Sequence, residues 1–129
     1  MRYIIDTHVW LWLLQDPGKL AAPVRQALEA ADDIVLSVAS VWEAAIKVKL
    51  GKLVLPRGVA DARDGFLRQT GARELPIQSA HVIAAADLPP VHRDPFDRLL
   101  IGQSQVEQLR HVTADNAIRS YGLPVEWAT

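Results

Sequence analysis

Four carboxylates stand where short apolar runs of the sequence give way to helical patterns: Asp6, Glu43, Asp97 and Asp115. In an open parallel α/β sheet, the junctions that follow the strands lie along one edge, where ligands bind. Carboxylates gathered at such an edge raise one another's pKa unless a cation lies between them. Oxygen ligands suit a hard cation such as Mg²⁺ or Mn²⁺. The spacing of these acids therefore predicts a metal site.

Helix capping offers a simpler explanation for each acid taken alone. Asp6 and Asp115 each precede a helical pattern, where a side-chain oxygen accepts a hydrogen bond from a first-turn amide. Ser40 and Glu43 have the spacing of a capping box, in which Glu43 reaches back to the amide of Ser40.

Asp94 before Pro95 also has the pattern of a cap, which leaves Asp97 in a first turn that favours negative charge. Capping does not explain why so many junctions carry a full charge, because serine or asparagine caps equally well without mutual repulsion. The combination of acids therefore favours the metal site.

Strand-like and helical patterns alternate along the chain. This order predicts an α/β fold with a mostly parallel central sheet and helices on both faces. The expected strands are 3–5, 34–37, 74–77, 111–113 and 124–127, and the expected helices are 7–15, 23–31, 40–50, 59–69, 79–88, 95–109 and 116–121. Pro76 predicts an edge strand, because proline cannot donate to a neighbouring strand. We find no repeat or linker, so residues 1–129 are expected to form a single domain.

Composition excludes several classes of protein. Half of the 129 residues are apolar and 22% are charged, which is typical of a globular domain. The chain has no cysteine, so disulfides, thiolate nucleophiles and cysteine zinc sites are excluded. Its longest apolar run, Val9 to Leu14, is far shorter than the roughly 20 residues of a membrane span. These features predict a cytoplasmic protein that does not enter a membrane.

Two further patterns concern possible partners. The formal net charge of −1 argues against bulk electrostatic binding of nucleic acid, although Lys47, Lys49 and Lys52 could form a local phosphate-contacting rim. The segment Val9 to Leu14 is apolar nearly all round, which is most often typical of a core helix, although burial on one side only would leave an exposed patch for a partner. We expect a homodimer on this basis. The four histidines show no helical pair at ligand spacing and are interpreted as surface or hydrogen-bonded residues.

Together these motifs resemble the PIN-domain family, and within it the VapC-type toxins of bacterial toxin–antitoxin pairs. The resemblance rests on Ile5–His8, Ser40–Glu43 with Lys47 and Leu50–Leu53, His92–Ile101, and Val112–Asp115. It extends to the closing Glu126–Ala128 and so covers nearly the whole chain. It implies a small α/β nuclease that depends on Mg²⁺ or Mn²⁺, cleaves RNA and is held silent by a cognate antitoxin.

The resemblance also implies roles for particular residues. The acids of the family correspond to Asp6, Glu43, Asp97 and Asp115, with Asp6 and Asp97 as the expected metal ligands, Thr113 as a supporting hydroxyl and Asp94 as a nearby acid. The division of roles between Asp94 and Asp97 stays open at this point. Gly102 departs from the alanine that relatives often have, which affects helix packing and not the chemistry. The expected reaction is metal-assisted hydrolysis of a phosphodiester bond.

Two other functions compete with this interpretation. A catalytically silent PIN-like module that only binds RNA or protein would be expected to lack one or more acids, and none is missing. A receiver-like regulatory domain that binds Mg²⁺ would need paired acids after the first strand and a lysine after the last. Asp6 stands alone and residues 124–127 contain no lysine, so the sequence favours the nuclease.

Overall fold

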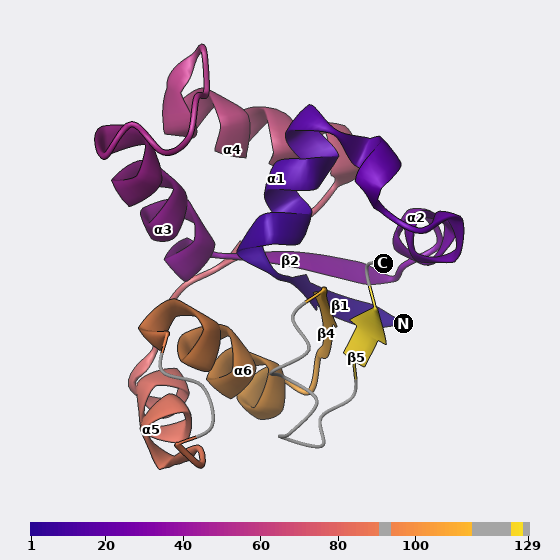
Figure 1. The fold of residues 1–129 in the computed structure, drawn as a ribbon. Coiled ribbons are helices and arrows are strands. Elements are labelled where there is room, and N and C mark those ends of the chain that lie inside the picture. The colour runs from indigo at the N-terminus through magenta and orange to yellow at the C-terminus, as the bar shows by residue number, and fades with distance from the viewer. Residues whose placement is uncertain (91–93, 115–124, 128–129) are drawn as a thin grey trace.

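The computed structural model describes residues 1–90, 94–114 and 125–127 (Figure 1). Strands and helices alternate along most of the chain. The strands are β1 (Arg2–Ile5), β2 (Asp33–Ser37), β3 (Arg73–Leu75), β4 (Arg110–Thr113) and β5 (Val125–Trp127). The helices are α1 (Thr7–Gln15), the 3-10 turn η1 (Pro17–Lys19), α2 (Ala22–Glu29), α3 (Val38–Lys49), α4 (Gly58–Thr70), α5 (Ser79–Asp87) and α6 (Pro95–Glu107). The expected helix 116–121 lies outside the described residues.

The strands form one sheet in the order β3-β2-β1-β4-β5, and each of these neighbouring pairs is parallel. This confirms the predicted parallel α/β fold. The first strand of the chain is the central one, with Ile4 opposite Val35 of β2 and Ile5 opposite Val112 of β4. The strand order reverses between β1 and β4, which makes their carboxyl ends the expected ligand site. At one edge, β3 ends before Pro76, as predicted for an edge strand.

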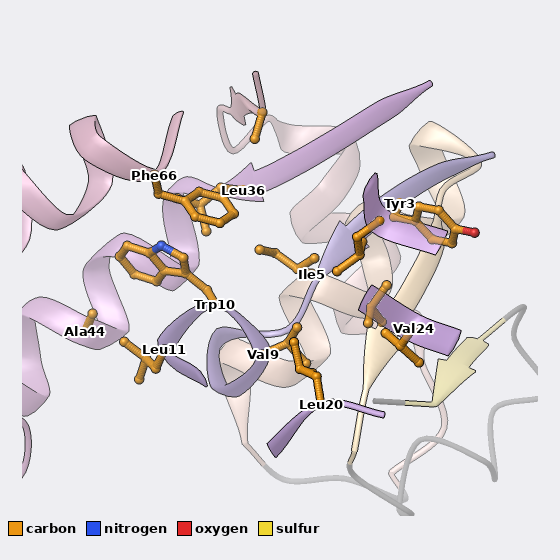
Figure 2. Close-up of a cluster of buried hydrophobic side chains, with 13 residues drawn as sticks. Tyr3, Ile5, Val9, Trp10, Leu11, Leu20, Val24, Leu36, Ala44 and Phe66 are labelled. Atoms are coloured by element: carbon orange, nitrogen blue, oxygen red, sulfur yellow. The ribbon is translucent and has the colours of Figure 1, made fainter. Parts of the chain in front are cut away.

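Side chains of β1 alternate between two hydrophobic cores. Tyr3 and Ile5 belong to a cluster that includes Trp10 of α1 and Phe66 of α4, whose rings meet edge to face (Figure 2). Ile4 points to the other face, where it belongs to a cluster with Leu100 of α6. Helices therefore cover both faces of the sheet, as Figure 1 shows for α1, α2 and α4 on one side and α5 and α6 on the other.

The apolar first helix is buried to a greater extent than its composition suggested. Val9 and Trp10 are fully buried and Leu11 nearly so, and Figure 2 shows them pointing into the core. Trp12, Leu13 and Leu14 are partly buried against the same cluster. The predicted exposed patch on this helix is therefore wrong, because the core buries Val9, Trp10 and Leu11 and the other three apolar side chains are partly buried against it. Among the described residues, no helix has the length and apolar character needed to span a membrane.

A glycine permits the close approach of α5 and α6. A Cβ atom added at Gly102 would lie 2.7 Å from the carbonyl oxygen of His81 and 2.8 Å from the amide nitrogen of Ala85. The His81 side chain is fully buried, with Nδ1 accepting from the Gln78 amide and Nε2 lying 3.0 Å from a carboxylate oxygen of Glu107. The absence of a side chain at position 102 is thus a packing requirement of this helix pair.

Ion pairs join the amino-terminal ends of three strands. Asp33 of β2 accepts two hydrogen bonds of 3.0 Å from the Arg73 guanidinium of β3 and one of 3.4 Å from Arg2 of β1. The Arg73 guanidinium holds the pKa of the Asp33 carboxyl below its usual value. The end of the sheet at which these strands begin is opposite the end that carries the candidate acids, and it has its own network of ion pairs.

Candidate metal site

Asp6 lies at the carboxyl end of the central strand and its side chain does not cap α1. It occupies the N-cap position, yet it makes no side-chain hydrogen bond to the helix. Its Oδ2 instead accepts a 2.7 Å hydrogen bond from the Thr113 hydroxyl at the end of β4. The other oxygen, Oδ1, is buried without a hydrogen-bond partner. Capping therefore does not explain this acid, whose side chain is bound by the Thr113 hydroxyl instead.

Glu43 is positioned by a contact between α1 and α3. Thr7, the residue after Asp6, donates a 2.9 Å hydrogen bond to the Ser40 hydroxyl, and both side chains are buried. Ser40 and Glu43 are three residues apart on α3 and so share a face of the helix. This hydrogen bond fixes the start of α1 against the face of α3 that carries Glu43.

The predicted capping box at Ser40 is wrong. Helix α3 begins at Val38, and its cap is Ser37, whose hydroxyl accepts from the Ala39 amide at 3.0 Å. Ser40 therefore lies inside the first turn of the helix and is not its cap. Glu43 has no capping role at the helix start, so its burial needs another explanation.

The Glu43 carboxylate is almost completely buried, and one of its two oxygens has a polar partner. Its Oε2 forms an ion pair of 3.1 Å with Nζ of Lys47, one helical turn further along, whose side chain is 30% exposed. Its Oε1 is buried without a hydrogen-bond partner. Lys47, one of the three lysines of the predicted basic rim, therefore forms an ion pair with an acid of the candidate site.

The structure separates the roles of Asp94 and Asp97. Asp94 is the N-cap of α6, and its Oδ1 accepts hydrogen bonds from the amides of Phe96 at 2.8 Å and Asp97 at 3.4 Å. Asp97 lies in the first turn of the helix and is 9% exposed. Asp94 thus has a structural role that asparagine could fill, whereas Asp97 stays a candidate ligand.

Arg98, in the same motif, stabilises the end of a neighbouring helix. Its guanidinium donates hydrogen bonds of 2.9 Å to the carbonyl oxygens of Ala85 and Leu88 and of 3.0 Å to that of Pro89. These carbonyls lie at the carboxyl end of α5, where backbone acceptors lack helical partners. The arginine therefore fixes α5 against the start of α6.

Packing between helices brings the acid-bearing segments toward one end of the sheet. Helix α3 packs against α1 and α6, and α1 packs against β4. Trp42 and Phe96, the residues before Glu43 and Asp97, join α3 to α6 through rings 5.1 Å apart at 72°. Sequence reasoning missed this aromatic pair and the Thr7–Ser40 hydrogen bond, although each lies beside a predicted acid.

The predicted four-acid cluster is only partly within the described residues. Asp115 lies outside them, and within the described ranges no three acidic or histidine side chains form a group that could hold a metal ion. The full cluster therefore stays a prediction.

The donor atoms present fit a hard cation. Asp6 Oδ1 and Glu43 Oε1 are buried carboxylate oxygens without hydrogen-bond donors. Leaving such an atom unpaired costs about 1–3 kcal/mol or more. A divalent cation that prefers oxygen ligands would satisfy them.

The family follows from comparison of the whole chain with known families. The PIN domain family model matches residues 3–123, a span that contains all four acids. The chain belongs to the PIN domain family.

Comparison with individual proteins gives a relative named as a ribonuclease and solved structures that share the fold. It is 28% identical over 124 residues to Ribonuclease VapC22 of Mycobacterium tuberculosis (strain ATCC 25618 / H37Rv), covering 94% of this chain and 92% of the relative. Two solved structures share its fold at 14% identity. VapBC2 from Rickettsia felis, bound to a promoter DNA fragment, matches with a TM-score of 0.77 over 100% of both chains. DNA-bound VapBC from Salmonella typhimurium matches with a TM-score of 0.78 over 100% of this chain and 99% of the other.

Proposed function

We propose that residues 1–129 form one PIN-like nuclease domain, a Mg²⁺- or Mn²⁺-dependent endoribonuclease that acts in the cytoplasm as the toxin of a type II toxin–antitoxin pair. The observation that carries this proposal is the pair of buried, unpartnered oxygens, Asp6 Oδ1 and Glu43 Oε1. Membership of the PIN family and the similarity to a protein named as a ribonuclease support it.

Each acid has a proposed role. Asp6 and Asp97 hold the metal, and the Thr113 hydroxyl fixes Asp6 by binding Oδ2, which keeps Oδ1 available. Glu43 and Asp115 complete the ligand set or orient the attacking water. Asp94 supports the site by capping the helix that carries Asp97.

The reaction is hydrolysis of an RNA phosphodiester bond by water. When bound, the divalent cation neutralises the scissile phosphate and the charge that develops on the leaving oxygen. The Glu43 carboxylate would orient the attacking water through Oε1, while its other oxygen is held by Lys47 at 3.1 Å. No side-chain nucleophile takes part, in keeping with a chain that contains no cysteine.

The test is cleavage of RNA by the purified protein freed of any antitoxin. Mg²⁺ and Mn²⁺ should support cleavage and EDTA should abolish it. Asp6→Asn and Asp97→Asn should remove most activity, whereas the matched change Asp94→Asn should retain it, because asparagine caps a helix as well as aspartate. Equal cleavage with metal and with EDTA would contradict the metal requirement.

The competing function is a silent PIN-like module that binds RNA or protein. It predicts a folded protein that binds RNA but never cleaves it, whichever metal is added. In that case Asp6→Asn would leave binding unchanged or strengthen it by removing a negative charge. The comparison of binding with cleavage on one preparation separates the two functions.

The proposed partners are RNA as substrate and a cognate antitoxin protein. The solved VapBC2 and VapBC structures that share the fold are bound to DNA, and a toxin–antitoxin complex from Klebsiella pneumoniae shares the fold too. Co-expression with a short protein from the neighbouring reading frame should yield a complex in which cleavage is suppressed. Full activity of a saturated complex would contradict the toxin role.

We also propose a homodimer, on a different surface from the one that the sequence suggested. Since Val9, Trp10 and Leu11 are buried, α1 does not supply the exposed patch. Large apolar side chains are exposed instead on α3 and α5, at Trp42 (58%) and at Val82 and Ile83 (51% and 60%). Light scattering at micromolar concentrations should give a dimer mass. A monomer throughout that range would argue against the dimer.

A further inference from the structure

A small pocket lies directly beside Asp6. It has a volume of about 200 Å³ and is lined by Asp6, His8, Trp12 and Ala114. Asp6 follows β1 and Ala114 follows β4, so the pocket lies where the strand order reverses. Ligands of open α/β sheets bind at this point. The position of the pocket in the fold is therefore that of a ligand-binding site.

Helix α1 supplies the two side chains with ring systems that line this pocket. His8 and Trp12 are four residues apart and so lie on the same side of the helix. That side differs from the one that carries Trp10, which is fully buried in the core (Figure 2). His8 is exposed and Trp12 partly buried. The helix thus uses one side for the core and another for the pocket.

The Trp12 indole is held in place from two directions. Part of it packs against the hydrophobic core, and Nζ of Lys19 lies over its ring, 5.8 Å from the ring centroid. A fixed aromatic ring costs less entropy when a ligand stacks on it than a mobile one would. The lysine also places a positive charge near a pocket that already contains the Asp6 carboxylate.

These groups match a nucleotide in an RNA chain. An aromatic side chain stacks on a nucleobase, an imidazole can donate to or accept from a base edge, and a lysine attracts phosphate. The net charge of −1 gives the chain little overall attraction for RNA. Local contacts beside the reacting bond must therefore supply much of the substrate affinity.

We propose that the pocket of Asp6, His8, Trp12 and Ala114 is a subsite for the nucleobase next to the scissile phosphodiester bond. The inference rests on the ribonuclease function proposed above. Trp12 supplies the stacking surface and His8 hydrogen-bonds the base edge, which makes His8 the residue that selects the base. Hydrogen bonds to base edges carry sequence information, whereas stacking is tolerant of sequence.

The binding test uses variants in an Asp97→Asn background, so that RNA is not consumed. A fluorescently labelled short RNA is titrated with Trp12→Leu, Trp12→Phe and a control, Val54→Ala, at an exposed apolar residue that does not line the pocket. Loss of one stacked base should weaken binding about 5- to 150-fold in Trp12→Leu. Trp12→Phe keeps an aromatic ring and should stay within about threefold of the parent. Melting temperatures of all variants exclude unfolding as the cause.

The specificity test uses active protein and a random-sequence RNA pool. Sequencing the cleaved ends should show a base preference at one position beside the cut, which His8→Ala relaxes and Val54→Ala does not. Unchanged binding in Trp12→Leu together with an unchanged base preference in His8→Ala would overturn the subsite and leave the ribonuclease function standing. Weakened antitoxin binding with unchanged RNA binding would also overturn it, because the pocket would then serve a protein partner. A wild type that never cleaves RNA would instead overturn the proposed function.

Discussion

Replacing Lys47 tests whether Glu43 is a buried charge that needs a counter-ion. The Glu43 side chain is 9% exposed, and within the described part of the chain its ion-pair partner is Lys47, at 3.1 Å. Lys47→Met keeps most of the apolar stem and removes the ammonium group. Both carboxylate oxygens of Glu43 would then lack a partner, because Oε1 already has none.

The burial of the two side chains sets the expected magnitude. Breaking a fully buried pair by removing one partner costs about 3–5 kcal/mol, whereas an exposed helical pair contributes about 0.3–0.5 kcal/mol. Lys47 is 30% exposed and Glu43 much less, so the pair lies between these limits. We expect Lys47→Met to lower the free energy of unfolding by about 1–2 kcal/mol at neutral pH.

Urea denaturation in EDTA measures this loss. Lys49→Met is the matched control, because Lys49 is an exposed lysine in the same last turn of α3. Among the described residues it forms no ion pair. It should stay within about 0.5 kcal/mol of the wild type. Adding Glu43→Gln to Lys47→Met should recover most of the loss, because the charge that needed a partner is gone.

Adding Mn²⁺ to the same assay links the measurement to the metal site. A bound cation would replace the missing ammonium as counter-ion, so Mn²⁺ should stabilise Lys47→Met by more than it stabilises the wild type. If Lys47→Met and Lys49→Met are equally stable in EDTA, the reasoning is refuted, and the pair would be an ordinary solvated contact.

Three further predictions follow from other contacts. Glu43→Gln should melt near the wild type yet cleave RNA on the order of 10²-fold more slowly, since glutamine cannot act as a base for water; equal rates would exclude Glu43 from the site. In urea denaturation, Gly102→Ala should lower the free energy of unfolding by about 1–3 kcal/mol, because its Cβ would lie 2.7 Å from a backbone atom of α5. Gly65→Ala has open space around the added Cβ and should raise the free energy of unfolding by up to about 1 kcal/mol. A change of the same sign in both variants would contradict the packing argument. Asp33 has a lowered pKa, so its contribution is present above about pH 4 and is lost on further acidification. The stability difference between wild type and Asp33→Asn should therefore shrink between pH 5 and pH 3, and a constant difference would contradict it.

The sequence predicted the sheet well because strand positions are a local property. Short apolar runs marked the starts and ends of β1, β2 and β4 to within a residue or two, and the parallel arrangement followed from the alternation of elements. The edge position of β3 was also predictable, because Pro76 cannot donate a hydrogen bond to a neighbouring strand.

Errors arose where tertiary contacts decided between local alternatives. Ser37 and Ser40 are both good caps, and the spacing to Glu43 favoured Ser40. The structure uses Ser37 instead, while Ser40 accepts a hydrogen bond from Thr7, 33 residues away. Likewise, sequence alone could not divide the roles of Asp94 and Asp97, which depend on where α6 begins.

The hydrogen bond between Thr113 and Asp6 can form only late in translation, after β4 has been synthesised. These two residues are 107 positions apart, so the Asp6 carboxylate is synthesised long before the Thr113 hydroxyl that binds it. A ribosome adds about 5–20 residues per second, which makes synthesis of this chain a matter of roughly ten seconds. Through most of that time the nascent polypeptide has no β4 and thus no support for Asp6. Fragments released early from the ribosome would lack β4 and therefore this support for Asp6.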